Sequence, residues 1–173
     1  MLSIDFAIQN YISTSRTESM TEFFYLLTTI FDLSIHFILV VVAFTLLFYL
    51  IGGLKRALLF FTTLTTGAII VSVLKMFFDV NRPAESSVEV FGKSFPSGHA
   101  TIATIFFIMT MYLFSDHLSR FQRILFNFSC IALIFLVSYS RIYLNAHWFS
   151  DVLFGVVLGI TVSYGTIKVY NRM

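Results

Sequence analysis

Five stretches of this 173-residue chain contain no aspartate, glutamate, lysine or arginine, and they constrain its fold more than any other feature. They cover residues 33–54, 57–74, 94–115, 124–140 and 152–167. At about 1.5 Å per helical residue, most of them reach or nearly reach the roughly 30 Å hydrocarbon thickness of a bilayer. The last two are short, so flanking apolar residues or snorkelling side chains must complete them. The pattern predicts five transmembrane helices.

Composition supports a membrane protein. Apolar residues make up 58% of the chain, the mean hydropathy is +0.89, and phenylalanine alone occupies 22 positions, which is far from the composition of a soluble domain. Apolar and polar residues do not alternate with a period of two over segments of about ten residues, so a lipid-spanning β-barrel is not expected. The net charge of +2 is too small and too scattered to indicate nucleic-acid binding. We therefore predict an all-α fold, a polytopic transmembrane helical bundle.

The first 31 residues differ from the rest. Apolar residues there follow the i, i+3, i+4, i+7, i+8 spacing of an amphipathic helix: Ile4, Ala7, Ile8, Tyr11 and Ile12. Polar residues 13–19 interrupt the pattern, and residues 20–31 are apolar but too short to span a bilayer. We expect residues 1–31 to form an amphipathic segment on the membrane surface, and residues 32–173 to form a single transmembrane domain.

The basic residues predict the orientation of the bundle. With five spans, the short connections at one end hold six of the eleven basic residues: Lys55, Arg56, Arg120, Arg123, Lys168 and Arg172. Cytoplasmic loops carry an excess of Lys and Arg, so this end is expected to face the cytoplasm. The other end carries the N-terminal segment and residues 79–93 and 141–151, and it is expected to face the extracytoplasmic side.

Six ionisable residues fall into three short clusters. These are Lys75 with Arg82-Pro83, then Pro96-Ser97-Gly98-His99, then Ser140-Arg141 with His147 and Asp151. All three clusters lie at the predicted extracytoplasmic end, in a chain of which only 12% is charged. The second cluster is typical of a turn that opens a helix and exposes its backbone N–H groups. In the third cluster, His147 and Asp151 are four residues apart, which places them on one helical face.

This set of groups suits phosphate chemistry. Cationic side chains and helix-terminal N–H groups bind a phosphoryl group and stabilise its charge during transfer. A neutral imidazole oriented by a carboxylate can attack phosphorus, and a second, protonated imidazole can give a proton to the leaving oxygen. Two histidines and an aspartate could also indicate a metal site, but three adjacent cations would repel a divalent ion. We expect neither a metal nor another cofactor.

The three clusters, in this order and spacing, resemble the signature of the type 2 phosphatidic acid phosphatase family, which also includes bacterial acid phosphatases and vanadium haloperoxidases. The resemblance covers residues 75–151. It implies that His147 is the nucleophile that forms a phosphohistidine, that Asp151 orients it, and that His99 is the general acid. It also implies a phosphate-binding set: Lys75, Arg82, Ser97, Gly98 and Arg141. The apolar spans favour the membrane branch of the family over its soluble branches.

Two departures from the family pattern leave the substrate open. Ala84-Glu85 follows Pro83 where many relatives have a second Arg-Pro, and many membrane members have six spans. The expected activity is hydrolysis of a phospholipid or a polyprenyl (di)phosphate, such as undecaprenyl diphosphate, at the extracytoplasmic face of a bacterial cytoplasmic membrane. A lipid phosphotransferase that uses the same intermediate is one alternative. A non-catalytic lipid-binding or transport protein on the same fold is another, although binding alone needs cations and no nucleophile.

Two further features concern packing. Gly155 and Gly159 are four residues apart, which favours close helix packing within the bundle over a dimer seam. Trp148, next to His147, is equally compatible with a headgroup-level anchor and with a wall of the substrate entrance.

Overall fold

The computed structural model describes residues 2–29, 31, 35–84, 86–88 and 91–172. These residues form six α-helices and one short 3₁₀ helix: α1 (Ser3–Thr14), α2 (Glu18–Thr29), α3 (Ile35–Phe77), α4 (Gly98–Phe114), η1 (Ser115–His117), α5 (Arg120–Tyr143) and α6 (Phe149–Tyr170). The described part of the chain contains no strand, so the all-α prediction is confirmed.

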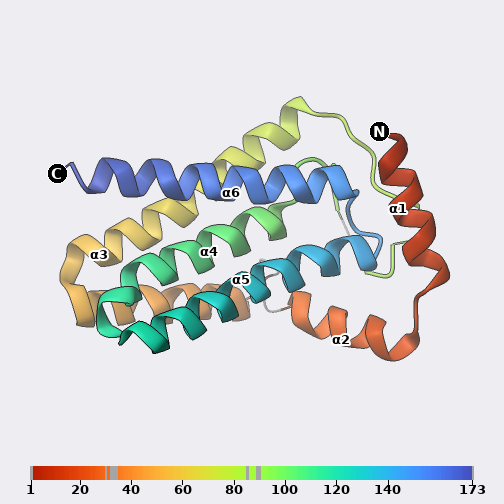
Figure 1. The fold of residues 1–173 in the computed structure, drawn as a ribbon. Coiled ribbons are helices and arrows are strands. Elements are labelled where there is room, and N and C mark those ends of the chain that lie inside the picture. Colours follow the sequence, from red (N-terminus) through yellow and green to blue (C-terminus); the bar gives the residue numbers. More distant parts are fainter. Residues whose placement is uncertain (1, 30, 32–34, 85, 89–90, 173) are drawn as a thin grey trace.

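The long helix α3 accounts for two of the predicted spans. Its 43 residues leave the helical conformation at Gly53, where φ is 72° and ψ is −174°, a backbone geometry that a residue with a Cβ rarely adopts. The chain turns there, and the arms 35–52 and 54–77 run in opposite directions (Figure 1). At about 1.5 Å per residue they are roughly 27 and 36 Å long. The sequence predicted a loop between the two spans at residues 55 and 56, whereas the chain turns at Gly53, just before these residues.

Four helices of the described chain are long and apolar enough to cross a membrane: α3, α4 together with η1, α5 and α6. Because α3 supplies two antiparallel arms, these four helices contain five apolar segments, one for each of the charge-free stretches. The helix α4 contacts α3, α5 and α6 and is the most buried of the four. It is therefore the central element of the bundle.

The predicted close packing at the two glycines is confirmed, and it joins α6 to α4. A Cβ at Gly155 would lie 2.8 Å from the carbonyl oxygen of Ser97. A Cβ at Gly159 would lie 2.7 Å from Cβ of Thr104 and 2.8 Å from the carbonyl oxygen of Thr101. Only glycine allows this approach, which holds the start of α6 against the start of α4. The two helices carry His99 and Asp151 in their first turns.

The N-terminal segment forms α1 and α2, which are separated by residues 15–17, within the predicted polar break. Both helices pack against the end of the bundle where α5 ends and α6 begins (Figure 1). The ring of Phe24 lies in the contact, 5.5 Å from the ring of Tyr139 and 4.8 Å from that of Tyr143. The placement of residues 1–31 on the membrane surface stays a prediction.

Candidate active site

The three sequence clusters meet at one end of the bundle. Lys75 lies in the last turn of α3, Arg82 in the following loop, and Arg141 in the last turn of α5. His147 lies in the turn before α6, and Asp151 lies in the first turn of that helix. Six of the eight predicted site residues line one cavity of about 580 Å³: Lys75, Arg82, Gly98, His99, Arg141 and His147.

Away from these residues the same cavity is largely apolar. It extends between the two arms of α3 and the first part of α4, and its lining includes Phe37, Val41, Val42, Phe61, Leu64, Ala68, Val71 and Ile102. Phe61 and Lys75 are fourteen residues apart on one helical arm, which corresponds to about 21 Å. The cavity is thus long and apolar, with cationic side chains and both predicted catalytic histidines gathered at one end.

His147 and Asp151 are both buried, at 2% and 1% exposure, but they do not bond directly. His147 Nδ1 lies 3.6 Å from Asp151 Oδ2, which is beyond hydrogen-bonding distance. Ser94 contacts both: its Oγ donates a hydrogen bond to Asp151 Oδ2 and is 3.4 Å from His147 Nδ1. The serine hydroxyl can therefore accept a hydrogen bond from Nδ1–H while it donates one to the carboxylate.

Ser94 is the site residue that the sequence analysis missed. It is fully buried, and its backbone N–H donates to the carbonyl of Val80 at 2.8 Å. Serine carries no charge, and Ser94 lies outside the Pro96–His99 motif, two residues before it. Its proximity to the start of this motif is the only signal that the sequence offers.

Asp151 also fixes the surrounding backbone. Its Oδ2 accepts a hydrogen bond from the N–H of Trp148 at 3.0 Å, which caps α6, and its carbonyl accepts one from the N–H of Ser97 at 3.2 Å. Trp148 is buried, and its Nε1 donates to the carbonyl of Asn81 at 2.8 Å. Trp148 therefore ties the loop after α3 to the turn that carries His147.

Backbone carbonyls hold the side chain of Arg82. Its guanidinium donates to the carbonyls of Phe91, Gly92, Lys93 and Ala146 at 2.9, 3.0, 3.3 and 2.7 Å. The ammonium of Lys75 donates to the carbonyl of Lys93 at 2.6 Å. The backbone carbonyl of Lys93 therefore binds both Lys75 and Arg82, and it holds these cations beside His147.

The contact between Arg82 and His147 indicates the protonation state of the histidine. Nη1 of Arg82 lies 3.2 Å from His147 Nε2, and because a guanidinium can only donate, Nε2 is the acceptor and the proton is on Nδ1. Burial lowers the pKa of His147 well below its ordinary value, and the charges of Arg82, Arg141 and Lys75 lower it further. His147 is thus a neutral imidazole whose Nε2 lone pair faces the cationic end of the cavity.

The remaining predicted residues take two kinds of position. Ser97 is fully buried, and its Oγ caps α4 by accepting from the N–H of Ala100 at 3.5 Å, so this motif opens a helix as predicted. The next residues, Gly98 and His99, line the cavity. Arg141 is 3% exposed, and its Nη1 donates to Thr28 Oγ1 in α2 at 2.5 Å. Among the residues that the structure describes, no three His, Cys, Asp or Glu side chains come together as a metal site.

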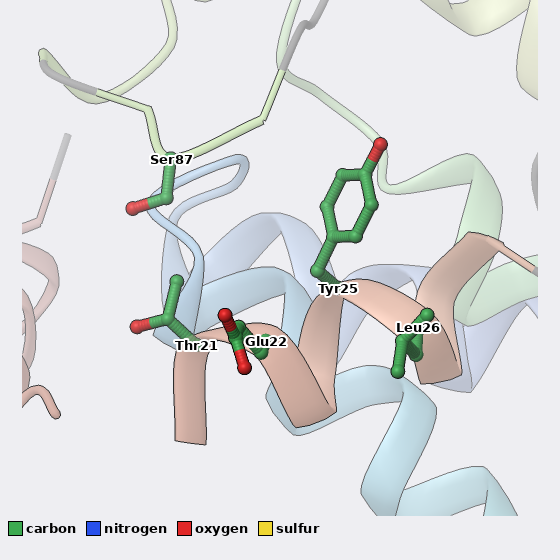
Figure 2. Close-up of a pocket in the computed structure, with 5 residues that line it drawn as sticks. All are labelled: Thr21, Glu22, Tyr25, Leu26 and Ser87. Atoms are coloured by element: carbon green, nitrogen blue, oxygen red, sulfur yellow. The ribbon is translucent and has the colours of Figure 1, made fainter. Parts of the chain in front are cut away.

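A second hollow, of about 350 Å³, lies between α2 and the loop that follows α3. Its lining is Thr21, Glu22, Tyr25, Leu26 and Ser87, as Figure 2 shows. None of the predicted site residues lines it, and of its five lining residues only Glu22 is acidic or basic. The cavity beside α3 is therefore the better candidate for an active site.

Comparison with known proteins agrees with this geometry. Residues 56–173 match the family model of the PAP2 superfamily. The chain belongs to the PAP2 superfamily. The matched region contains all eight predicted site residues, and the predicted relationship to type 2 phosphatidic acid phosphatases is confirmed. No curated protein matches the chain.

Two solved structures of PAP2-like proteins share the fold. One is a transmembrane PAP2-type phosphatidylglycerolphosphate phosphatase from Bacillus subtilis, with a TM-score of 0.89 and 24% identity over 99% of this chain and 86% of that one. The other is LpxE from Aquifex aeolicus, with a TM-score of 0.74 and 21% identity over 96% of each chain. Because both identities are below 25%, the similarity establishes the fold alone. It covers nearly the whole chain, including the N-terminal helices.

Proposed function

We propose that this protein is an integral membrane lipid phosphatase that removes phosphate from a phospholipid or a polyprenyl (di)phosphate. The observation that carries the proposal is the shape and charge of the cavity. Its apolar length fits a lipid chain, and its cationic end fits a phosphate. The similarity to a phosphatidylglycerolphosphate phosphatase from Bacillus subtilis supports the same substrate class.

In the proposed reaction, Lys75, Arg82 and Arg141 bind the phosphoryl oxygens, together with the N–H groups at the Ser97–Gly98 turn. Nε2 of His147 attacks phosphorus, so a P–N bond forms and the P–O bond to the lipid breaks. His99 gives its proton to the leaving oxygen. Arg82 is placed to move its hydrogen bond from Nε2 to a phosphoryl oxygen, since Nη1 is 3.2 Å from that nitrogen.

The second half of the reaction regenerates the enzyme. Neutral His99 takes a proton from water, the water oxygen attacks phosphorus, and the P–N bond breaks to release phosphate and neutral His147. In the first step, the attack on phosphorus makes the His147 imidazole positively charged. The negative charge of Asp151, 3.6 Å from Nδ1, stabilises this imidazolium, and the Ser94 hydroxyl can accept a hydrogen bond from its Nδ1–H.

The decisive experiment measures phosphate release by the purified protein from four lipids: phosphatidic acid, phosphatidylglycerol phosphate, undecaprenyl diphosphate and lipid A. Release from at least one of them, abolished by His147→Ala, supports a phosphatase. Phosphate that appears only on an added acceptor lipid would identify a phosphotransferase. Binding of these lipids without turnover would identify a lipid-binding protein and contradict the proposal.

We propose that the reaction needs no metal, because cations already surround the phosphate position. Excess EDTA should leave the activity largely intact. Vanadate should inhibit, since it can become five-coordinate like the transition state. Complete loss of activity in EDTA that zinc or magnesium restores would contradict a metal-independent site.

We further propose that the site faces the extracytoplasmic side of a bacterial cytoplasmic membrane, on the basis of the basic residues at the opposite end. In a Cys130→Ala background, Ser87→Cys should react with a membrane-impermeant thiol reagent on intact cells. Ser119→Cys, just before α5, should react only after permeabilisation. The reverse pattern would contradict this orientation.

A further inference from the structure

Asp5, in the first turn of α1, is a buried carboxylate that the proposed reaction does not use. It is 1% exposed, and burying a carboxylate is unfavourable unless it is well hydrogen-bonded. Oδ1 accepts from the backbone N–H of Ser150 at 2.9 Å. Oδ2 accepts from Ser150 Oγ at 2.9 Å and from the N–H of Leu2 at 3.0 Å. Two of its three hydrogen bonds therefore hold one residue, 145 positions away.

Ser150 lies in the turn that carries the proposed chemistry. It directly precedes Asp151 and follows His147 by three residues. Its N–H is one of the first in α6 and has no partner within the helix, so the Asp5 carboxylate caps the helix from outside. Asp151 binds the N–H of Trp148 at the same terminus. Two carboxylates thus fix the start of α6, one from within the helix and one from α1.

Other contacts of the N-terminal segment hold the backbone on the opposite side of this turn. The ring of Phe6 lies 5.0 Å from that of Trp148. Gln9 Nε2 donates to the carbonyl of Ile142 at 3.3 Å, and Arg16 Nε donates to the carbonyl of Tyr143 at 2.7 Å. Residues 5–16 therefore hold both the end of α5 and the start of α6, which flank His147.

We propose that Asp5 is a positioning residue for His147 and Asp151, acting through Ser150. The inference rests on the proposed function and adds a group outside the region that matches the family model, which begins at residue 56. The physical reason is that nucleophilic attack needs Nε2 in line with the bond that breaks. A misplacement of about 1 Å can lower the rate about 10²-fold. Asp5 does not line the cavity, so its substitution should affect turnover and not binding.

The test compares Asp5→Ala, Asp5→Asn, Ser150→Ala and the double variant Asp5→Ala/Ser150→Ala. Tyr11→Ala is the matched control, because Tyr11 is on the same helix and is 75% exposed. We expect Asp5→Ala to lower kcat about 10- to 100-fold with KM changed less than about twofold. Ser150→Ala loses only the Oγ bond and should cost less. The double variant should be no slower than Asp5→Ala, because both changes break one interaction.

Hydrogen exchange of residues 146–152 gives a readout that does not depend on activity. It should be faster in Asp5→Ala and Asp5→Asn than in the wild type and unchanged in Tyr11→Ala. If Asp5→Ala does not fold, Asp5→Asn decides, since its Oδ1 can still accept from the Ser150 N–H. Its kcat should fall at least severalfold.

The two proposals fail in different ways. An active wild type with unchanged kcat and exchange in Asp5→Asn would overturn the role of Asp5, as would multiplicative effects in the double variant. A wild type that releases no lipid phosphate would overturn the proposed function, and the exchange measurement would then decide alone whether Asp5 holds this turn.

Discussion

The two ends of the bundle carry cations in different ways. At the end with the cavity, Arg82 and Arg141 are bonded to atoms of distant segments, and Arg141 is 3% exposed. At the other end, Arg123 and Lys168 are exposed, and Arg56 reaches over the surface to Asp116 at 3.1 Å. Charge that is buried and held in place can act on a bound phosphate. Exposed lysine and arginine side chains contribute to the orientation of a protein in the membrane, and they can exchange hydrogen-bond partners with water.

One histidine from each end gives the sharpest test of this comparison. His147→Ala should reduce turnover by several orders of magnitude, because the proposed covalent nucleophile is lost. His117→Ala, at the opposite end, should leave turnover unchanged. Phosphate release by the purified variants, with their melting temperatures as a folding control, measures both. More than about a tenth of the wild-type rate in His147→Ala would contradict the nucleophile assignment.

The second prediction separates the two histidines of the cavity. His99→Ala should slow turnover about 10²- to 10⁴-fold, the usual contribution of a general acid. Labelled phosphate should still be trapped on His147 in this variant, after quenching and digestion under alkaline conditions, because the P–N bond of a phosphohistidine is labile in acid. Trapping in His147→Ala would reverse the two roles.

The third prediction compares two glycines of α6. Gly159→Ala should lower the free energy of unfolding by about 1–3 kcal/mol, because the new Cβ would overlap Thr104 and the Thr101 carbonyl. Nothing lies within 4 Å of a Cβ at Gly165, so Gly165→Ala should be neutral or stabilise by up to about 1 kcal/mol. Unfolding in detergent measures both. An equal loss in the two variants would contradict tight packing of α6 on α4.

The fourth prediction concerns pH. The pKa of His147 is lowered by burial and by neighbouring cations, so its neutral form persists as the pH falls below the ordinary value of 6.5. An ordinary histidine would be only about a quarter neutral at pH 6. Phosphohistidine formation measured with substrate well below KM reports the free enzyme, so its second-order rate constant should stay above half its maximum at pH 6. An acidic midpoint at or above pH 6.5 would show that the site does not depress this pKa.

The smallest effect is expected for Arg56→Gln. Its ion pair with Asp116 is partly exposed on the arginine side and largely exposed on the aspartate side, at 26% and 69%. Such pairs contribute at most about 1 kcal/mol and are screened by salt. Stability should change by less than that, and kcat should not change. A large loss of activity would mean that the two ends are coupled.

The sequence predicted the helical bundle and the meeting of the three clusters because both depend on strong local signals. A charge-free stretch of about twenty residues has few physical explanations, and so does an ionisable residue at the end of such a stretch. Ser94 and Asp5 were not predicted, because their importance comes from partners 57 and 145 residues away. The turn of α3 was placed a few residues late, because Lys55-Arg56 indicated a loop and Gly53 provides the positive φ.

The carbonyl groups around Arg82 have a consequence for how this enzyme could diversify. The arginine binds the backbone of residues 91–93 and none of their side chains, and the side chain of Phe91 is 84% exposed. Substitutions at positions 91 and 93 can therefore alter the surface of this loop while the guanidinium keeps its anchors. Insertions or deletions in the same loop would move those anchors. The loop is thus free to evolve by substitution and constrained in length.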